Sequence, residues 1–315
     1  MSMTSVISPR QTALSALRAV DLFCGCGGLS KGLISAGIDV AEAYDCWPQA
    51  LETYVHNIGG HAVEFDLSDV DATSERISSL APDLVVGAPP CQDFSTAGKR
   101  IEAGHANLTI AFGRILARCK PPAFLMENVP QVRLSETYKR MRQTVSAEGY
   151  TVVETVLDAS WYGVPQIRRR FFAFGYLGNG DQGERFEQYL DAKKATQRLT
   201  VKQYMGGEIN IEFYYRHPRN YSRRSVFSVH EPSPTVRGVN RPVPPKYAGN
   251  HLDSVPPSEV RPLTTRERGR VQTFPIEWEW DGRNRNADTE LQIGNAVPVQ
   301  LAERVAEAVQ YTTQP

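Results

Sequence analysis

Short apolar runs alternate with segments of helical periodicity over the first half of the chain. The runs are rich in β-branched and aromatic residues, as in buried strands. Between them, several segments carry apolar side chains at helical spacing, and Pro48 suits the first turn of one helix. Alternation of this kind predicts an α/β lobe built on a parallel sheet. The strand runs are residues 19–23, 40–44, 84–86, 124–126, 151–157 and 171–174, and the helical segments are residues 29–36, 48–57 and 108–118.

The pattern changes at Gly-Asn-Gly-Asp, residues 178–181. A polar, helix-like stretch follows, and then an irregular region rich in Pro, Arg and Tyr that extends to about residue 262. Residues 299–311 close the chain with a regular amphipathic helical pattern, which we expect to fold back onto the first lobe. We therefore predict a larger lobe of residues 1–178 and 285–315 and a smaller, irregular lobe of residues 179–284.

Composition is that of an ordinary soluble protein, with 41% hydrophobic and 22% charged residues in a chain of 315. No apolar run approaches the roughly 18 residues that span a bilayer, and residues 1–18 lack the features of a secretory signal. Five cysteines form no C-x-x-C pair, so we expect free thiols in a reducing, cytoplasmic compartment and no structural zinc site. They are Cys24, Cys26, Cys46, Cys91 and Cys119.

The formal net charge is zero, but the charges are unevenly distributed. Residues 214–246 contain seven Lys or Arg and a single acid, Glu231. Two further basic clusters are residues 168–170 and the arginines between residues 261 and 270. Arginine runs are commonly solvated faces, so this distribution supports a nucleic-acid partner only together with catalytic motifs.

A thiol and a carboxylate occupy corresponding positions after two strands. Cys91 follows the run at 84–86 behind a stiff Pro-Pro step, in Gly-Ala-Pro-Pro-Cys-Gln-Asp-Phe-Ser. Glu127 follows the run at 123–126, in Glu-Asn-Val. Neighbouring strands of a parallel sheet end at one edge, so both side chains could face one pocket. A lone cysteine is as often a small buried apolar residue, and that alternative stays open for Cys91 taken singly.

A glycine-rich turn at residues 21–30 follows the first strand and opens a helix, where backbone amides can hold a ligand. Gly25, Gly27 and Gly28 do not fit the G-x-G-x-x-G pattern of dinucleotide sites, which weakens an NAD-linked function. Asp45 ends the next strand and suits a ribose diol, while Asp66 ends a third apolar segment and suits an adenine amino group. The turn therefore favours an adenosine ligand over a tight turn with unrelated surface acids.

Four motifs stand in a fixed order: Pro-Pro-Cys-Gln-x-Phe-Ser at 89–95, Glu-Asn-Val at 127–129, Gln-x-Arg-x-Arg at 166–170 and Gly-Asn-Ala-Val at 294–297. With the glycine-rich turn, they resemble the ordered motifs of the cytosine-C5 DNA methyltransferases over nearly the whole chain. The resemblance implies a Rossmann-like, S-adenosyl-L-methionine-dependent methyltransferase sheet with a smaller, irregular target-recognition domain. It also implies a compact, monomeric enzyme of prokaryotic type.

The resemblance assigns roles to individual residues. The thiolate of Cys91 would add to carbon 6 of cytosine while Glu127 hydrogen-bonds to or protonates nitrogen 3; carbon 5 takes the methyl group, and elimination restores the ring. Arg170 would approach the target cytosine and Arg168 the backbone beside it. One departure is visible, since Cys46 and then Trp47 stand where the family often has a large aromatic residue after the ribose-binding acid. S-adenosylmethionine, leaving as S-adenosylhomocysteine, would be bound by Phe23, Gly25, Gly27, Asp45, Asp66, Pro90 and Asn295.

The substrate implied is double-stranded DNA, from which the target base must rotate into the pocket. The second lobe supplies cations and planar rings, and Arg237, Asn240 and Arg241 are candidate base readers. Thr235-Val236 is alternatively a structural staple, and residues 263–267 and 272–275 resemble a family motif with a packing role. A cognate restriction endonuclease is a candidate partner. The candidate DNA contacts are Ser95, Arg216, Arg223, Arg237, Asn240 and Arg241.

Two alternatives remain at this point. One is a transfer-RNA cytosine-C5 methyltransferase of the same architecture, which the arginine-rich second lobe makes less favoured than a DNA enzyme. The other is a catalytically silent DNA-binding homologue, against which the intact set of Cys91, Glu127 and Arg170 speaks.

Overall fold

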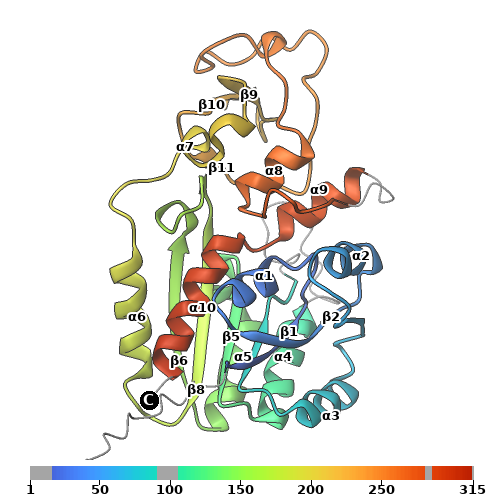
Figure 1. Cartoon of the computed structure of the whole chain (residues 1–315), viewed down its shortest axis with the longest axis vertical. Helices are drawn as coiled ribbons and strands as arrows, with labels where there is room; N and C mark the ends of the chain where they lie inside the picture. The colour runs from blue at the N-terminus through green and yellow to red at the C-terminus, as the bar shows by residue number, and fades with distance from the viewer. Residues whose placement is uncertain (1–15, 91–105, 281–285, 314–315) are drawn as a thin grey trace, which may run out of the picture.

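The computed structural model describes residues 16–90, 106–280 and 286–313 (Figure 1). Its larger lobe is built on a seven-stranded sheet in which the strand order is β3-β2-β1-β4-β5-β8-β6. The sheet therefore places β1 and β4 at its centre. The strands are β1 (Arg18–Leu22), β2 (Asp39–Asp45), β3 (Ala62–Glu64), β4 (Leu84–Gly87), β5 (Ala123–Asn128), β6 (Tyr150–Asp158) and β8 (Arg169–Leu177).

Helices cover both faces of this sheet. One apolar cluster joins the sheet to α1 (Gly28–Ser35), α2 (Pro48–Asn57), α6 (Gln182–Lys193) and α10 (Val299–Thr313). A second cluster joins the opposite face to α3 (Val70–Leu80), α4 (Ala106–Cys119) and α5 (Glu136–Ala147). The larger lobe is thus a three-layer α/β/α structure, as the alternating pattern predicted.

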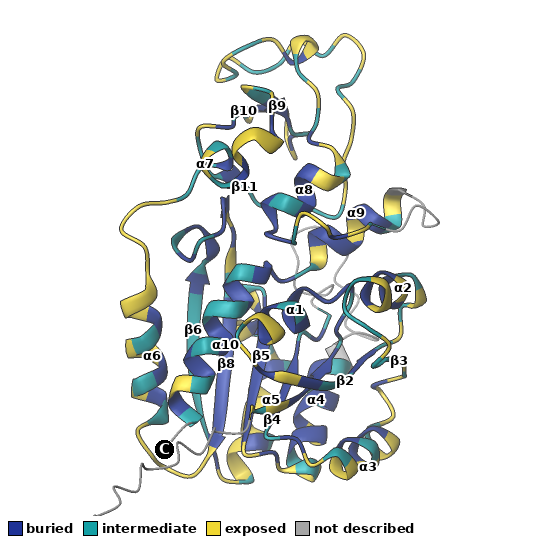
Figure 2. Cartoon of the chain, viewed as in Figure 1, coloured by how far each residue is buried: buried dark blue, intermediate teal, exposed yellow. Residues whose placement is uncertain are grey.

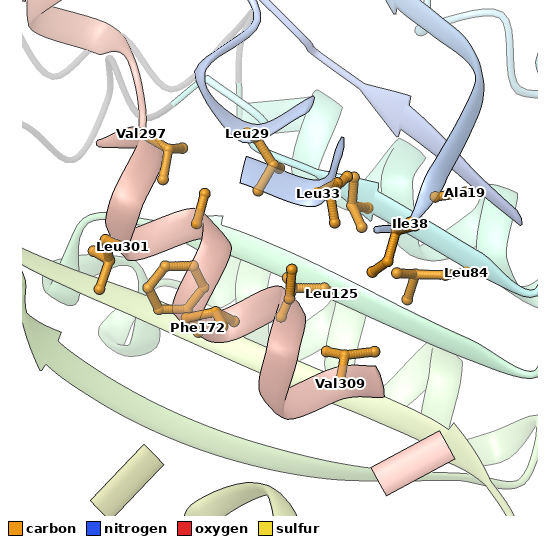
Figure 3. Close-up of a cluster of buried hydrophobic side chains, with 14 of the residues drawn as sticks. Ala19, Leu29, Leu33, Ile38, Leu84, Leu125, Phe172, Val297, Leu301 and Val309 are labelled. Carbon is orange, nitrogen blue, oxygen red and sulfur yellow. The ribbon is translucent and has the colours of Figure 1, made fainter. Parts of the chain in front are cut away.

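The side chains of each strand alternate between these two clusters. On β1, Ala19 packs in the cluster of α1 and α10, while Val20 packs in the cluster of α4 and α5. On β5, Leu125 packs in the first cluster and Phe124 in the second, because successive side chains of a strand point to opposite faces of the sheet. Figure 3 shows the first cluster, in which Leu301 of α10 lies among sheet side chains. Strands β4 and β5 are buried throughout and β1 is buried beyond Arg18, and Figure 2 shows these strands as buried.

The sheet is not wholly parallel, which differs from the prediction. Strands β1 to β5 pair in parallel, but β8 is antiparallel to both β5 and β6. The connection from β6 to β8 holds only the short helix η2 (Ala159–Trp161) and the two-residue strand β7 (Gln166–Ile167). That is too short for the helical crossover that parallel pairing requires. As a result, the first residues of β8 lie beside the carboxyl end of β5, where Phe171 is opposite Asn128.

Most predicted helices are confirmed, including α2, which begins at Pro48, and α10, which packs against α1. The pattern did not reveal α3, α5 or the three-residue strand β3, whose sequences are polar or short. No described helix is long and apolar enough to cross a membrane.

The observed lobe boundary differs from the one predicted at residue 179. Helix α6 packs against α10, and its residues Phe186 and Leu190 belong to the apolar cluster of the sheet. This helix is therefore part of the larger lobe, and the second lobe begins after it. The sequence did not reveal that α6 belongs to the larger lobe, because most of its positions are polar and a narrow apolar stripe is enough to pack a helix against its neighbour.

The second lobe has its own small core. Val201, Tyr214, Val236 and Ile293 belong to it, and the last of these comes from α9 (Asn286–Asn295), which also contacts α2. Strand β7 pairs with β11 and so joins the lobes. The remaining elements of the second lobe are α7 (Val201–Met205), η3 (Gly206–Glu208), β9 (Phe213–Tyr215), β10 (Val226–Ser228), β11 (Ser233–Pro234), η4 (Pro257–Glu259) and α8 (Thr265–Val271). The short helix η1 (Pro130–Leu134) belongs to the larger lobe.

Candidate active site

Strands β4 and β5 leave the sheet together at their carboxyl ends, with Gly87 opposite Met126. Asn128, which is buried, connects the two segments that follow. Its Nδ2 donates to the carbonyl of Pro89 at 2.9 Å, and its Oδ1 accepts the Val129 N–H at 2.8 Å. Asn128 therefore shapes this turn, as predicted, and fixes the segment leading to Cys91 beside the end of β5. Cys91 and Ser95 themselves lie outside the described residues.

Glu127 ends β5 and is 5% exposed. Arg170 reaches it from the start of β8, with 2.9 Å between the arginine Nε and the carboxylate Oε1. Burial raises the pKa of Glu127, and the neighbouring Arg170 and Arg168 oppose this rise only in part. The reversal of β8 is what brings Arg170 here, because a parallel strand would have begun at the opposite edge. The site thus holds a carboxyl group that retains a proton at higher pH than an exposed glutamate does.

Arg168 occupies a position different from the expected contact with the DNA backbone. Its side chain is 1% exposed and donates to three backbone carbonyls, those of Val236 at 3.1 Å, Gly294 at 2.9 Å and Ala296 at 2.9 Å. The guanidinium is enclosed where β8, the second lobe and the segment after α9 meet. Arg168 is therefore a strut between the lobes, which its sequence motif alone did not distinguish from a phosphate ligand.

Two buried glutamines extend this joint. Gln166 accepts the N–H of Val236 at 2.8 Å and donates to the side chain of Gln272 at 2.7 Å. The hydroxyl of Thr235 donates to the carbonyl of Ile167 at 2.7 Å. Thr235 and Val236 thus make the hydrogen bonds that the alternative of a structural staple requires, and Gln272 packs in the same joint.

The glycine-rich turn is held by the acid at the end of the next strand. Asp45 accepts the Gly25 N–H at 2.8 Å through Oδ2 and the Trp47 N–H at 2.9 Å through Oδ1. Gly27 adopts a φ of 92°, and a Cβ built there would lie 2.4 Å from the Cδ1 of Ile58. Glycine is therefore required at Gly27 for both conformational and steric reasons.

The other expected cofactor residues lie at the same edge of the sheet or beside it. Phe23 directly follows β1, is half-buried and has a positive φ of 62°. Asp66 follows β3 and is exposed, and its hydrogen bonds with Ser68 lower the pKa of its carboxyl group. Pro90 is half-buried, and Asn295 is exposed at the end of α9. Because β1, β2 and β3 are neighbours, Phe23, Gly25, Gly27, Asp45 and Asp66 share one edge.

One buried acid was not predicted to matter. Asp21 lies within β1, is 0% exposed and accepts a hydrogen bond from the Ser30 hydroxyl at 2.6 Å. Burial raises the pKa of Asp21 to about 7. A charged residue inside an otherwise apolar strand was the available signal. The side chain lies beneath the glycine-rich turn and joins it to α1.

Three of the four described cysteines have structural environments, whereas Cys46 is exposed. Cys24 and Cys26 are buried, and burial raises the pKa of Cys26 to about 12. Cys119 is half-buried and donates to the carbonyl of Ser74 at 3.4 Å. None of these three is poised as a thiolate nucleophile, in agreement with the prediction. Over residues 16–90, 106–280 and 286–313, no group of three or more His, Cys, Asp or Glu side chains could hold a metal ion.

The candidate DNA contacts of the second lobe fall into two sets. Arg216, Arg237, Asn240 and Arg241 line one hollow, which also includes Arg268. Arg223 is separate and exposed, on the loop between β9 and β10. The importance of Arg268 was missed, because its sequence neighbourhood resembled a packing motif.

A family model described as C-5 cytosine-specific DNA methylase matches residues 17–311. The chain belongs to this methylase family. The methylase is 44% identical to the Type II methyltransferase M.HgiDI of Herpetosiphon aurantiacus, over 95% of this chain and 96% of the relative. It is 45% identical to the Type II methyltransferase M.HindV of Haemophilus influenzae, over 93% and 96% of the two chains.

Solved structures share the fold of the methylase. A putative DNA modification methyltransferase encoded within a prophage of E. coli aligns with a TM-score of 0.70 and 22% identity, over 94% of this chain and 99% of that one. The Dnmt2 methyltransferase of S. pombe aligns with a TM-score of 0.68 and 20% identity, over 94% and 98%. The predicted Rossmann-like methyltransferase fold is confirmed, and the enzyme class is DNA (cytosine-5-)-methyltransferase. The transfer-RNA alternative is not favoured.

Proposed function

We propose that this methylase modifies carbon 5 of one cytosine within a specific sequence of double-stranded DNA, with Cys91 as the nucleophile and Glu127 as the acid. The observation that carries the proposal is the arrangement at the ends of β4 and β5. Asn128 anchors Pro89, two residues before Cys91, and Glu127 stands beside it in an ion pair with Arg170. A thiol nucleophile and a carboxyl group able to donate a proton are what addition to a pyrimidine ring requires.

Glu127 supports the thiol addition by holding a proton at ring nitrogen 3. Addition of a thiolate to carbon 6 pushes electron density toward that nitrogen, and burial raises the pKa of the Glu127 carboxyl group, which favours the protonated form that can donate. Arg170 fixes the carboxyl group through its Nε, and its Nη1 donates to the carbonyl of Arg169 at 2.8 Å. Cys91 then leaves as a thiolate once carbon 5 has lost its proton.

The edge formed by β1, β2 and β3 fits S-adenosylmethionine, on which the family depends in general. A Cβ built on Gly25 meets no heavy atom within 4 Å among the described residues, so the backbone there is open to a ligand. Each oxygen of Asp45 accepts one backbone N–H and retains a second lone pair for a ribose hydroxyl. Phe23, Gly27, Asp66, Pro90 and Asn295 would complete the site. The bound cofactor supplies an electrophilic methyl group on a sulfonium.

The second lobe would bind the DNA. Arg223 is exposed and suits a phosphate contact, whereas Arg216, Arg237, Asn240 and Arg241 share a hollow and suit base edges. The two relatives described above are named Type II methyltransferases, and a cognate restriction endonuclease is accordingly the partner we propose. We also propose that the enzyme acts as a cytoplasmic monomer.

The test is base-resolution sequencing of 5-methylcytosine in DNA from a methylation-free host. Wild-type protein should mark one short sequence, and the Cys91→Ala variant should mark none while still binding S-adenosylmethionine. Cys119→Ser is the matched control, because Cys119 is a half-buried structural thiol, and this variant should mark the same sequence as the wild type. Soluble wild-type protein that binds the cofactor but leaves no mark would refute the proposal.

A further inference from the structure

Several arginines in the second lobe gather around one hollow. Its walls include Arg216, Arg237, Arg241 and Arg268, together with Tyr215 and Asn240. Apolar side chains make up much of the remaining wall, and these are Val236, Val239 and Leu263. The hollow, at about 30 Å³, is too small to enclose a base, so only its exposed side could meet the edge of a planar ligand that carries hydrogen-bond acceptors.

Among these arginines, Arg216, Arg237 and Arg268 are occupied by the protein. Arg216 donates to the carbonyl of Thr235 at 2.8 Å, and Arg237 donates to a carbonyl of the loop between β9 and β10. Arg268 is buried and pairs with Glu290. Each of the three side chains has at least one donor engaged in a backbone or ion-pair contact, which fixes it in the wall of the hollow.

The positive charge of the hollow is poorly neutralised. Burial lowers the pKa of Arg216 to about 10, and repulsion by Arg237 contributes to that shift. Burial and repulsion by Arg219, Arg268 and Arg241 likewise lower the pKa of Arg237. In the part of the chain that the structure describes, the only carboxylate paired with an arginine of this hollow is that of Glu290. A ligand that presents acceptors or negative charge therefore relieves repulsion that the free protein carries.

Arg241 differs from its neighbours. It is exposed at the rim of the hollow, and no hydrogen bond or ion pair joins its guanidinium to any residue that the structure describes. It lies close enough to Arg237 and His217 to lower the pKa of both. Its five donors are thus available to a ligand at the exposed side of the hollow.

The segment that carries Arg241 is fixed to α9 and, through Arg168, to the larger lobe. A Cβ built on Gly294 would lie 2.1 Å from the backbone nitrogen of Gly238, so the two backbones are in direct contact. Arg168 binds the carbonyls of Val236 and Gly294 on either side of this contact. The segment therefore leaves a rigid joint beside the active site and places Arg241 a few residues beyond it.

We propose that Arg241 reads a guanine of the target sequence, while Arg216, Arg237 and Arg268 build the wall that positions it. The inference rests on the proposed function, since it needs duplex DNA as the substrate. Guanine presents O6 and N7 in the major groove at a spacing that matches the guanidinium fork. A phosphate offers a similar pair of acceptors, but the exposed side chain of Val239 lines the same hollow and gives an apolar contact that favours a base over a hydrated phosphate.

The test compares purified full-length Arg241→Ala with the wild type on a library of duplexes in which every base around the methylated cytosine is varied. Loss of one bidentate base contact should reduce kcat/KM on the wild-type sequence by about 5- to 150-fold. Discrimination should relax at one guanine position only, and Arg241→Lys should retain part of it. The control is Arg140→Ala, which removes an exposed arginine from α5 of the larger lobe. This variant should keep full activity and the sequence preference of the wild type.

The outcomes separate the possibilities. Activity could instead fall equally on all sequences, and the salt dependence of DNA binding could weaken by the equivalent of about one phosphate contact. That result would assign Arg241 to the DNA backbone and overturn guanine reading. Unchanged activity and preference would overturn any DNA contact. Methylation by the wild type in the same assay keeps the proposed function intact in both cases, whereas its absence overturns the function and the inference together. Thermal denaturation should show equal stability for all variants, because the exposed Arg241 guanidinium makes no hydrogen bond or ion pair with any residue that the structure describes.

Discussion

Replacing Arg168 with methionine tests whether this side chain is a strut between the lobes or a DNA ligand. Methionine keeps the apolar length of the side chain and removes its donors. The carbonyls of Val236 and Gly294 then lose a charged donor, while the carbonyl of Ala296 keeps a bond from Gln272. We therefore expect Arg168→Met to destabilise the DNA-free protein.

The magnitude follows from the two carbonyls. Each buried polar group left without its partner costs about 1–3 kcal/mol, so the free energy of unfolding should fall by about 2–6 kcal/mol. An unfolding entropy of roughly 2.1 cal/mol/K per residue, applied to the 315 residues of the chain, corresponds to about 1.5 °C in Tm for each kcal/mol. The expected loss in Tm is therefore about 3–9 °C.

The assay is thermal denaturation in the absence of DNA, followed by calorimetry. Arg169→Met is the matched control, because Arg169 is the adjacent arginine but is exposed. Its Tm should stay close to that of the wild type. If Arg168→Met unfolds within about 1 °C of Arg169→Met, the strut interpretation is wrong, and a DNA contact that matters only in the complex becomes the better explanation.

Three further changes have definite expected outcomes. Glu127→Gln removes the proton donor and should lower kcat by about 10²- to 10⁴-fold, measured by single-turnover methyl transfer, with cofactor affinity unchanged. Asp21→Asn tests a carboxyl whose pKa is raised to about 7: the folded protein holds a proton that the unfolded chain releases, so wild-type stability falls as pH rises through this window. Between about pH 4 and pH 8, the free energy of unfolding of the wild type, measured with denaturant, should fall by about 4 kcal/mol relative to that of Asp21→Asn. If the two proteins showed parallel dependences of this free energy on pH, the raised pKa of Asp21 would be wrong. Gly294→Ala forces a Cβ against the backbone of Gly238 and should lower both Tm and kcat/KM, whereas Gly207→Ala, which meets nothing within 4 Å among the described residues, should not.

Much of the larger lobe could be predicted because its strands and helices obey simple periods. The run at Leu84–Gly87 is apolar at every position, as befits a strand covered on both faces. The direction of β8 could not be read in this way, since a parallel and an antiparallel buried strand have the same apolar pattern. Only the length of the connection from β6 carries that information, and its consequence is the pairing of Arg170 with Glu127.

The roles of the arginines were harder to predict than their presence. Arg168 and Arg170 share one motif and face one region, yet the first is enclosed by carbonyls and the second pairs with a carboxylate. Arg237 and Arg241 likewise differ in whether the protein already uses their donors. The sequence shows where each arginine stands. The backbone carbonyls that accept its hydrogen bonds come from distant segments, and only folding brings them to it.

The position of α10 has a consequence for how the enzyme is made. This helix packs between α1 and α6 in the larger lobe, yet it follows the second lobe in the chain. A ribosome therefore synthesises the whole second lobe before Leu301 and Val305 can join the apolar cluster of the larger lobe. Until α10 emerges, apolar side chains such as Leu33 and Phe186 remain open to chaperones. The newly made methylase should thus become active in a single late step, after both of its lobes have already been translated.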